Sequence, residues 1–239
     1  MKEFLLKFAN ISAITYENPS TATTKFKAMG YRSVTFMERD NAEGYFLEGP
    51  HEYVLSFRGT EVSQKSDIVA DLKVKKVTFT SGRGRVHSGF FKETQKLLPY
   101  IHSLKFDPFK PLYITGHSLG AAIATIVAAV LGDKASMLIT FGSPRVGTAD
   151  FVKSINVNHY RVQNNDDDVP LVPSRMTGYR HHGENVYINY YGQLKQYGTW
   201  EQLKDMLISR LRGIMSKEYF KGINDHLMAS YIAKLSMPE

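Results

Sequence analysis

The sequence predicts a mostly parallel α/β fold, in which helices cover both faces of a central sheet. Short apolar runs such as 111–115 and 137–141, typical of buried strands, alternate along the chain with longer segments of helical periodicity. Parallel strands need such helical crossovers, and a parallel sheet buries both of its faces. The chain has 239 residues, 43% of them hydrophobic, which is enough for a full core. We therefore expect a single domain over residues 1–239.

The N-terminal third predicts one helix followed by an antiparallel edge of the sheet. An amphipathic helix is expected to run to about Tyr16, with these apolar residues on one side: Phe4, Leu5, Phe8, Ile11 and Ile14. Strands of a meander follow at 33–37, 44–48 and 52–57. The turn residues between them are Asn41, Gly44, Gly49 and Pro50.

The remaining elements alternate between helix and strand. Helices are expected at 87–104 and 121–131, strands at 137–141 and 159–163, and a last helix from His226. The stretch 200–214 is a second amphipathic segment, whose apolar stripe is Trp200, Leu203, Leu207, Leu211 and Ile214. We interpret this stripe as a core-packing face. Docking on a membrane and shaping the entrance of a site are the alternatives.

Composition excludes several function classes. The chain has no cysteine, which excludes a thiol nucleophile, thiolate metal sites and disulfides, and no metal or cofactor is expected. A formal charge of +7 is compatible with anionic interfaces, although we interpret it as a solvated basic surface. Nucleic-acid binding is not expected, because no binding motif occurs and the basic residues are dispersed.

The N-terminus and the hydropathy of the chain bear on localisation. Glu3 and Lys7 interrupt the first apolar stretch, so no signal-peptide core is recognised. No uncharged segment reaches the length of a membrane span. We expect a soluble protein that is cytoplasmic or is exported by a route not visible in the sequence, and its oligomeric state is left open.

The most informative motif is Gly116-His117-Ser118-Leu119-Gly120, a G-x-S-x-G pentapeptide. An apolar strand precedes it and a helix rich in small residues follows it. Strand, tight turn and helix are the context in which this motif forms a nucleophile elbow. The turn would place the Ser118 hydroxyl at the helix N-terminus, where free N–H groups and the helix dipole face developing negative charge.

A serine nucleophile needs a base, and the base needs an orienting carboxylate. In folds with this elbow, the acid and then the histidine follow the serine along the chain. Asp166, Asp167 and Asp168 come after the strand at 159–163, and spacing alone does not choose among them. For the base we favour His226 over the adjacent pair at 181–182, because His226 lies after the last expected strand.

The two donors of an oxyanion hole are also suggested by the pattern. Leu119, directly after the serine, supplies one backbone N–H. Thr60, at the end of Arg58-Gly59-Thr60 after an earlier strand, is the candidate for the second.

Taken together, these motifs resemble those of the class 3 lipases, the fungal-lipase-like branch of the α/β-hydrolases. The matching segments occur in the family's order: Phe57-Arg58-Gly59-Thr60, Asp67-Ile68-Val69-Ala70-Asp71-Leu72, Val86-His87-Ser88-Gly89-Phe90, the 116–120 pentapeptide, 140–147, Asp167-Asp168-Val169-Pro170 and Asp225-His226-Leu227. The resemblance implies an α/β-hydrolase fold with a short lid helix. It also assigns the acid to Asp167, the base to His226 and the first oxyanion residue to Thr60.

The resemblance further implies an activity. The expected enzyme is a serine carboxylic-ester hydrolase (EC 3.1.1.-), a triacylglycerol lipase or esterase that acts on lipid or small esters through an acyl-enzyme. Phospholipase A1 or feruloyl-type esterase activity is the alternative, and a non-catalytic lipase-like binding module is a second. A transient contact with a lipid interface is also expected.

The lid is expected at about residues 61–72. Its apolar side and His117, beside the serine, are the expected substrate contacts: Val62, Ile68, Val69, Leu72 and His117. A cover that moves and a fixed surface helix remain alternatives. The chain departs from the family at Ile68, where a tryptophan is usual. It also lacks the cysteines that extracellular fungal members pair, which indicates a bacterial or intracellular-type member.

Overall fold

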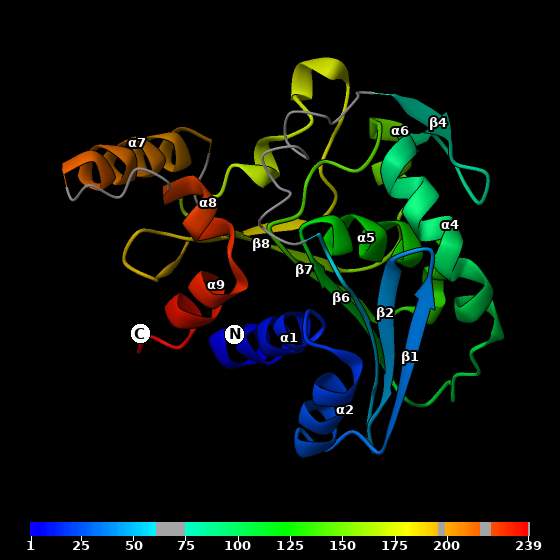
Figure 1. Cartoon of the computed structure of the whole chain (residues 1–239). Coiled ribbons are helices and arrows are strands. Elements are labelled where there is room, and N and C mark those ends of the chain that lie inside the picture. Colours follow the sequence, from blue (N-terminus) through cyan, green and yellow to red (C-terminus); the bar gives the residue numbers. More distant parts are fainter. Residues whose placement is uncertain (61–74, 196–198, 216–220, 239) are drawn as a thin grey trace.

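A computed structural model describes residues 1–60, 75–195, 199–215 and 221–238, and eight strands of this part of the chain form one sheet (Figure 1). The strand order is β1-β2-β3-β6-β7-β8-β9-β10. The bounds are β1 Ser33–Arg39, β2 Ala42–Glu48, β3 Tyr53–Phe57, β6 Leu112–His117, β7 Met137–Phe141, β8 His159–Asn164, β9 Glu184–Ile188 and β10 Leu194–Lys195. A separate hairpin pairs β4 (Lys76–Thr78) with β5 (Arg85–His87).

The sheet is parallel in its middle and antiparallel at both edges. Strands β3, β6, β7, β8 and β9 run parallel, whereas β1 and β2 form the expected meander and β10 folds back on β9. The predicted fold class is therefore confirmed. Because parallel strands have their carboxyl ends on the same side of the sheet, the residues that follow β3, β6 and β8 lie near one another.

Helices cover both faces of the sheet (Figure 1). Their bounds are α1 Lys2–Ile14, α2 Pro19–Ala28, α4 Ser88–Ser103, α5 Leu119–Leu131, α6 Ala149–Lys153, α7 Thr199–Met215, α8 Lys221–His226 and α9 Met228–Leu235, with short 3-10 turns at Gly132–Lys134, Val169–Leu171 and Arg175–Thr177. Helices α1 and α9 pack with one core cluster, and α4 and α5 with the other. In β7, Leu138 belongs to one cluster and its neighbour Ile139 belongs to the other, because successive side chains of a strand point to opposite faces of the sheet.

The first helix forms as its periodicity predicts, since Leu5, Phe8 and Ile11 are fully buried. Helix α2 was not predicted. Asn18 caps it, accepting a hydrogen bond from the backbone N–H of Thr21, and Pro19 occupies its first turn. The expected C-terminal helix forms as α9, but His226, which was expected at its start, instead ends the separate helix α8, and Leu227 has extended backbone angles between the two.

Helix α7 corrects one interpretation of the sequence. Its apolar stripe was expected in the core, yet Trp200 is 76% exposed and Leu207 is 60% exposed. The buried side carries Met206 and Ser209 instead. Leu203, Leu211 and Ile214, also expected in the stripe, lie outside the described side chains.

The structure does not describe the expected lid, and it tests the expectation of no membrane span only for the described helices. The lid at 61–72, with Val62, Ile68, Val69 and Leu72, lies outside the described residues. Among the helices that are described, none combines the length and apolar character needed to cross a bilayer.

Candidate active site

Ser118 lies at a sharp turn between strand β6 and helix α5. Its backbone has φ 59° and ψ −124°, a strained conformation for a residue with a Cβ atom. The flanking glycines make the turn possible by close approach. A Cβ atom on Gly116 would lie 2.4 Å from the carbonyl oxygen of Gly120, and one on Gly120 would lie 2.1 Å from that of Phe57. The turn thus places the serine hydroxyl on the side of the sheet where the parallel strands have their carboxyl ends.

Three predicted residues meet on this side of the sheet in a chain of hydrogen bonds. The Oγ atom of Ser118 lies 2.9 Å from Nε2 of His226. The Nδ1 atom of His226 lies 2.8 Å from Oδ2 of Asp167. All three side chains are buried, so water does not compete strongly for these bonds.

The partners define the tautomer of His226. A carboxylate can only accept, so Nδ1 of His226 carries the proton and donates it to Asp167. In the neutral ring, Nε2 then has a lone pair that accepts the hydroxyl proton of Ser118. This arrangement prepares the serine for proton transfer to the imidazole.

Asp167 is held by further donors that the sequence did not reveal. Its Oδ1 accepts the backbone N–H of Val169 at 3.0 Å, and its Oδ2 accepts the hydroxyl of Tyr231 at 2.6 Å. Burial and the nearby carboxylate raise the pKa of Tyr231 well above its usual value, so the phenol remains a donor. These bonds compensate the charge of a fully buried carboxylate.

Asn164, at the end of β8, forms hydrogen bonds that connect the segment carrying Asp167 to the segment carrying His226. Its backbone N–H donates to the Tyr231 hydroxyl at 3.1 Å, and its side-chain amide donates to the carbonyl of Asp225 at 2.7 Å. Asp225 in turn accepts the backbone N–H of Asp166 at 3.2 Å. Asn164 and Tyr231 were not singled out, and Asp225 was named only as part of the segment Asp225-His226-Leu227, because the partners of these residues are remote in sequence.

His117 lies behind His226. Its Nε2 atom lies 2.7 Å from the backbone carbonyl of His226, and its Nδ1 atom lies 2.8 Å from the hydroxyl of Tyr16. Because the carbonyl can only accept, Nε2 carries the proton and Nδ1 accepts from Tyr16. The ring is 2% exposed and its centroid lies 4.5 Å from that of His226. This placement suits support of His226 rather than the expected contact with a substrate.

The loop after β3 runs beside the serine. A Cβ atom on Gly59 would lie 3.2 Å from Cβ of Ser118 and 2.3 Å from the hydroxyl of Tyr16, so only glycine fits there. Arg58 anchors the loop through an ion pair of 2.8 Å with Glu43. Thr60, the candidate oxyanion residue, follows directly and is half-buried. Leu119, the other candidate, is the first residue of α5.

The competing candidates are placed elsewhere. Asp168 is exposed, and Asp166 is buried beside Asp225 rather than at His226. His181 lies near the carbonyl of Pro170 at 2.8 Å, and burial together with neighbouring Arg161 lowers its pKa well below the usual value. His182 stacks on His159. None of these side chains is hydrogen-bonded to Ser118 in the described residues.

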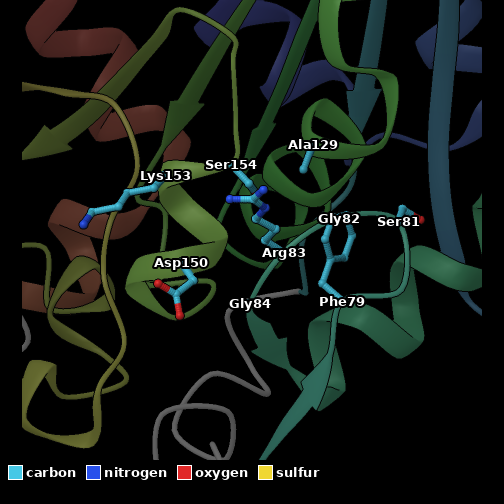
Figure 2. A pocket seen from close by; sticks show the side chains of 9 residues that line it. All are labelled: Phe79, Ser81, Gly82, Arg83, Gly84, Ala129, Asp150, Lys153 and Ser154. Carbon is cyan, nitrogen blue, oxygen red and sulfur yellow. The ribbon is translucent and has the colours of Figure 1, made fainter.

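Two cavities lie away from this constellation. One, of about 660 Å³, is formed by the turn between β4 and β5 together with α6 (Figure 2). Figure 2 shows the side chain of Lys153 turned away from the other lining residues. The second, of about 410 Å³, lies at the start of β8. In the described part of the chain, no group of three or more metal-binding side chains is arranged around an ion site.

Comparison with known proteins identifies similar sequences. Residues 54–177 match the family model "Lipase (class 3)". The chain is 38% identical over 117 residues to Toxin TseL of Vibrio cholerae, covering 46% of this chain and 18% of the toxin. It is 33% identical over 148 residues to secreted mono- and diacylglycerol lipase 1 of Fusarium solani, covering 58% of this chain and 44% of that lipase. The chain thus spans less than half the length of either relative.

A solved structure extends the likeness to the fold. The crystal structure of a lipase from Rhizopus microsporus var. chinensis superposes with a TM-score of 0.67 at 26% identity, covering 78% of this chain and 74% of that one.

Proposed function

Because the chain belongs to the class 3 lipase family, we propose that it is a serine hydrolase that cleaves carboxylic esters of lipids. The observation that carries the proposal is the hydrogen-bonded sequence Ser118–His226–Asp167 at the strained turn before α5. A buried serine, histidine and carboxylate joined in this order are the parts needed to activate a hydroxyl at neutral pH.

In the proposed reaction, Ser118 Oγ attacks the ester carbonyl while its proton passes to Nε2 of His226. The imidazolium that forms donates Nδ1–H to the Asp167 carboxylate, which stabilises the positive ring. His226 then gives the proton to the leaving alcohol, and an acyl-enzyme remains. Water, deprotonated by His226, attacks the acyl carbonyl, the bond to Ser118 Oγ breaks as the imidazolium returns the proton to Oγ, and the carboxylic acid is released.

Negative charge on the carbonyl oxygen needs donors in the transition state. We assign this role to the backbone N–H of Leu119 at the start of α5 and to Thr60. The first N–H groups of a helix have no acceptor within the helix, and the helix dipole is positive there. A Cβ atom added to Gly59 would lie 3.2 Å from Cβ of Ser118, and this closeness supports a position for Thr60 next to the reacting atoms.

Lipid esters are the proposed substrate class, in keeping with the family and with the acylglycerol lipase among the relatives. The single-domain organisation over 1–239 and a cover formed by residues 61–72 are parts of the same proposal.

The test is hydrolysis of p-nitrophenyl esters from acetate to palmitate, with the wild type beside Ser118→Ala. We expect the variant to lose roughly 10⁴- to 10⁶-fold in kcat, since the nucleophile is removed and the fold is not. Circular dichroism and thermal unfolding of both proteins control for folding. Serine-dependent turnover of long chains supports a lipase, and turnover of short chains alone supports an esterase.

A parallel assay of fatty-acid release from phospholipids and of feruloyl esters tests the alternative substrates. If the folded wild type hydrolyses no ester, the chain is instead a binding module of this fold.

A further inference from the structure

The outer face of helix α7 is the part of the surface that the proposed chemistry leaves unexplained. We define this face by its exposed residues Trp200, Lys204, Leu207 and Ile208. They lie on one side of the helix, at positions three, four and seven apart. Trp200 is 76% exposed, Leu207 is 60% exposed and Ile208 is 48% exposed. Scattered apolar residues are normal on a surface, but a stripe of them along one helix marks an interaction site.

The orientation of α7 is fixed by polar contacts on its inner side. Oδ2 of Asp205 accepts the side-chain amide of Asn165 at 2.6 Å and the hydroxyl of Tyr187 at 3.0 Å. The hydroxyl of Ser209 donates to Oδ1 of Asn165 at 2.5 Å. Since these groups are satisfied only in this orientation, Trp200 and Leu207 are held outward.

We propose that the outer face of α7 docks on the surface of an anionic phospholipid membrane. Tryptophan is an amphipathic ring suited to the boundary between headgroups and acyl chains, and Leu207 and Ile208 supply apolar area for insertion. Lys204 lies between them, and its chain can extend its ammonium to a phosphate group. Exposed Tyr191 adds a second amphipathic ring on the turn that contacts α7 through the Tyr190 N–H.

Charge complementarity favours lipid over a neutral partner. The chain carries a formal charge of +7, and exposed Lys204 lies on the outer face itself. Of the two acidic residues of α7, Asp205 is turned inward and bonded to Asn165, whereas Glu201 is exposed beside Trp200, so the attraction comes from Lys204 and the net charge of the chain. Each basic residue near an anionic membrane adds attraction that falls with salt.

The location of α7 also fits this role. Asn165, which α7 holds, lies two residues before Asp167. The next described element along the chain after α7 is α8, which ends at His226. Docking through α7 would therefore bring the candidate active site to the membrane. The relevance of the contact to catalysis rests on the proposed function, whereas the contact itself does not.

The chain has a single tryptophan, so the fluorescence of Trp200 reports on this face directly. The measurement uses the full-length Ser118→Ala variant, which leaves the vesicles intact, with phosphatidylcholine vesicles and with vesicles that also contain phosphatidylglycerol. We expect a blue shift of Trp200 emission, and its quenching by brominated acyl chains, with the anionic vesicles. Raising the salt concentration should weaken both.

Variants test the named residues. Leu207→Glu should lower the partition onto anionic vesicles about tenfold or more, because it replaces an inserted side chain by a charge. Lys204→Glu should lower it about fivefold or more. The matched control is Phe109→Glu, because Phe109 is 93% exposed but lies before the amino end of the central strand β6.

Several outcomes would overturn the proposal. They are binding to neutral and anionic vesicles with equal strength, co-sedimentation without a change in Trp200 emission, and absence of binding. Emission that is already blue-shifted without lipid, together with a dimer on size exclusion, would assign the face to a second copy of the chain. Hydrolysis of a soluble short ester by Leu207→Glu in an otherwise wild-type chain, measured separately, tests the proposed function alone.

Discussion

At the scale of single residues, the candidate site depends on buried polar groups whose hydrogen-bond partners must be of one kind, either donors or acceptors. Asp167 accepts bonds from His226, Tyr231 and the N–H of Val169, and all three donors address the charged form of the carboxylate. If asparagine replaced Asp167, its NH2 group would face hydrogen-bond donors and could not accept their bonds. The chemistry therefore follows from hydrogen-bond polarity as well as from distance.

Replacing Asp167 by asparagine should lower kcat by about 10⁴-fold, because the amide favours the wrong tautomer of His226 and cannot stabilise the imidazolium. The measurement is steady-state hydrolysis of a soluble ester. Asp168→Asn is the matched control, since Asp168 is adjacent but exposed. A severe loss in the control with a mild loss at position 167 would show that the acid is misassigned.

Tyr16 should act as a positioning residue through His117. Its hydroxyl contacts Nδ1 of His117, whose Nε2 contacts the backbone of His226. Tyr16→Phe removes one hydrogen bond, so we expect kcat to fall roughly 2- to 12-fold with KM unchanged. The control is Tyr113→Phe, which alters another tyrosine that packs against α1. Equal effects of the two substitutions would indicate a general loss of packing instead.

At the scale of elements, the contact between β8 and β9 contains an unbalanced charge. Arg161 and Asn185 are register neighbours on these parallel strands. Within the described residues, Nε of Arg161 and Oδ1 of Asn185 are both buried without a hydrogen-bond partner. Burial and the nearby Arg145 lower the pKa of Arg161 to about 10. Such unsatisfied groups weaken the strand pair.

Asn185→Asp should stabilise the protein by about 1 kcal/mol, because it supplies a carboxylate of the same shape to Arg161. For a chain of this size, Tm should rise by about 2–4 °C in differential scanning calorimetry. The arginine would lower the folded-state pKa of the new carboxyl, so the gain should be present above about pH 4 and should be lost in more acidic solution. Asn158→Asp, at an exposed position, is the control. A lower Tm at pH 7 would contradict the argument.

At the scale of the whole molecule, the sheet is closed on both faces by apolar clusters, so titratable groups that lie inside must stay neutral or find partners. His159, which is buried, and His181, which is half-buried, are two groups that desolvation affects in this way. Desolvation is the main cause that lowers both pKa values, and Arg161 lowers each further. In the folded protein, both imidazole rings are therefore neutral.

Stability should therefore decrease in mildly acidic solution. Above about pH 6.5 both rings are neutral in the folded and unfolded states, and below it the unfolded chain binds protons that the folded chain does not. The free energy of unfolding should fall by up to about 1.4 kcal/mol per pH unit for each histidine. Urea titrations between pH 8 and pH 5 measure this slope. His181→Gln, which retains a donor for Pro170, should flatten it, whereas replacement of exposed His51 by glutamine should leave it unchanged.

Much of the fold was predictable because its signals are local. The apolar runs of the strands and the periodicity of α1 and α5 report burial within a few residues. The elbow is equally local, since the need for glycine at 116 and 120 arises from atoms of adjacent turns and strands. The sequence by itself thus determined the meander, the parallel strands up to β8 and the position of Ser118, whereas β9 and β10 were not among the expected strands.

Tertiary structure decided which side chains meet. The bonds of His226 to Asp167 and to Ser118 join residues 59 and 108 positions apart, and no local pattern distinguishes Asp167 from its two aspartate neighbours. The outward face of α7 was likewise not encoded by its apolar stripe, because polar anchors at Asp205 and Ser209 outweigh it. Periodicity records that a helix has two sides, but only its packing partners determine which side is buried.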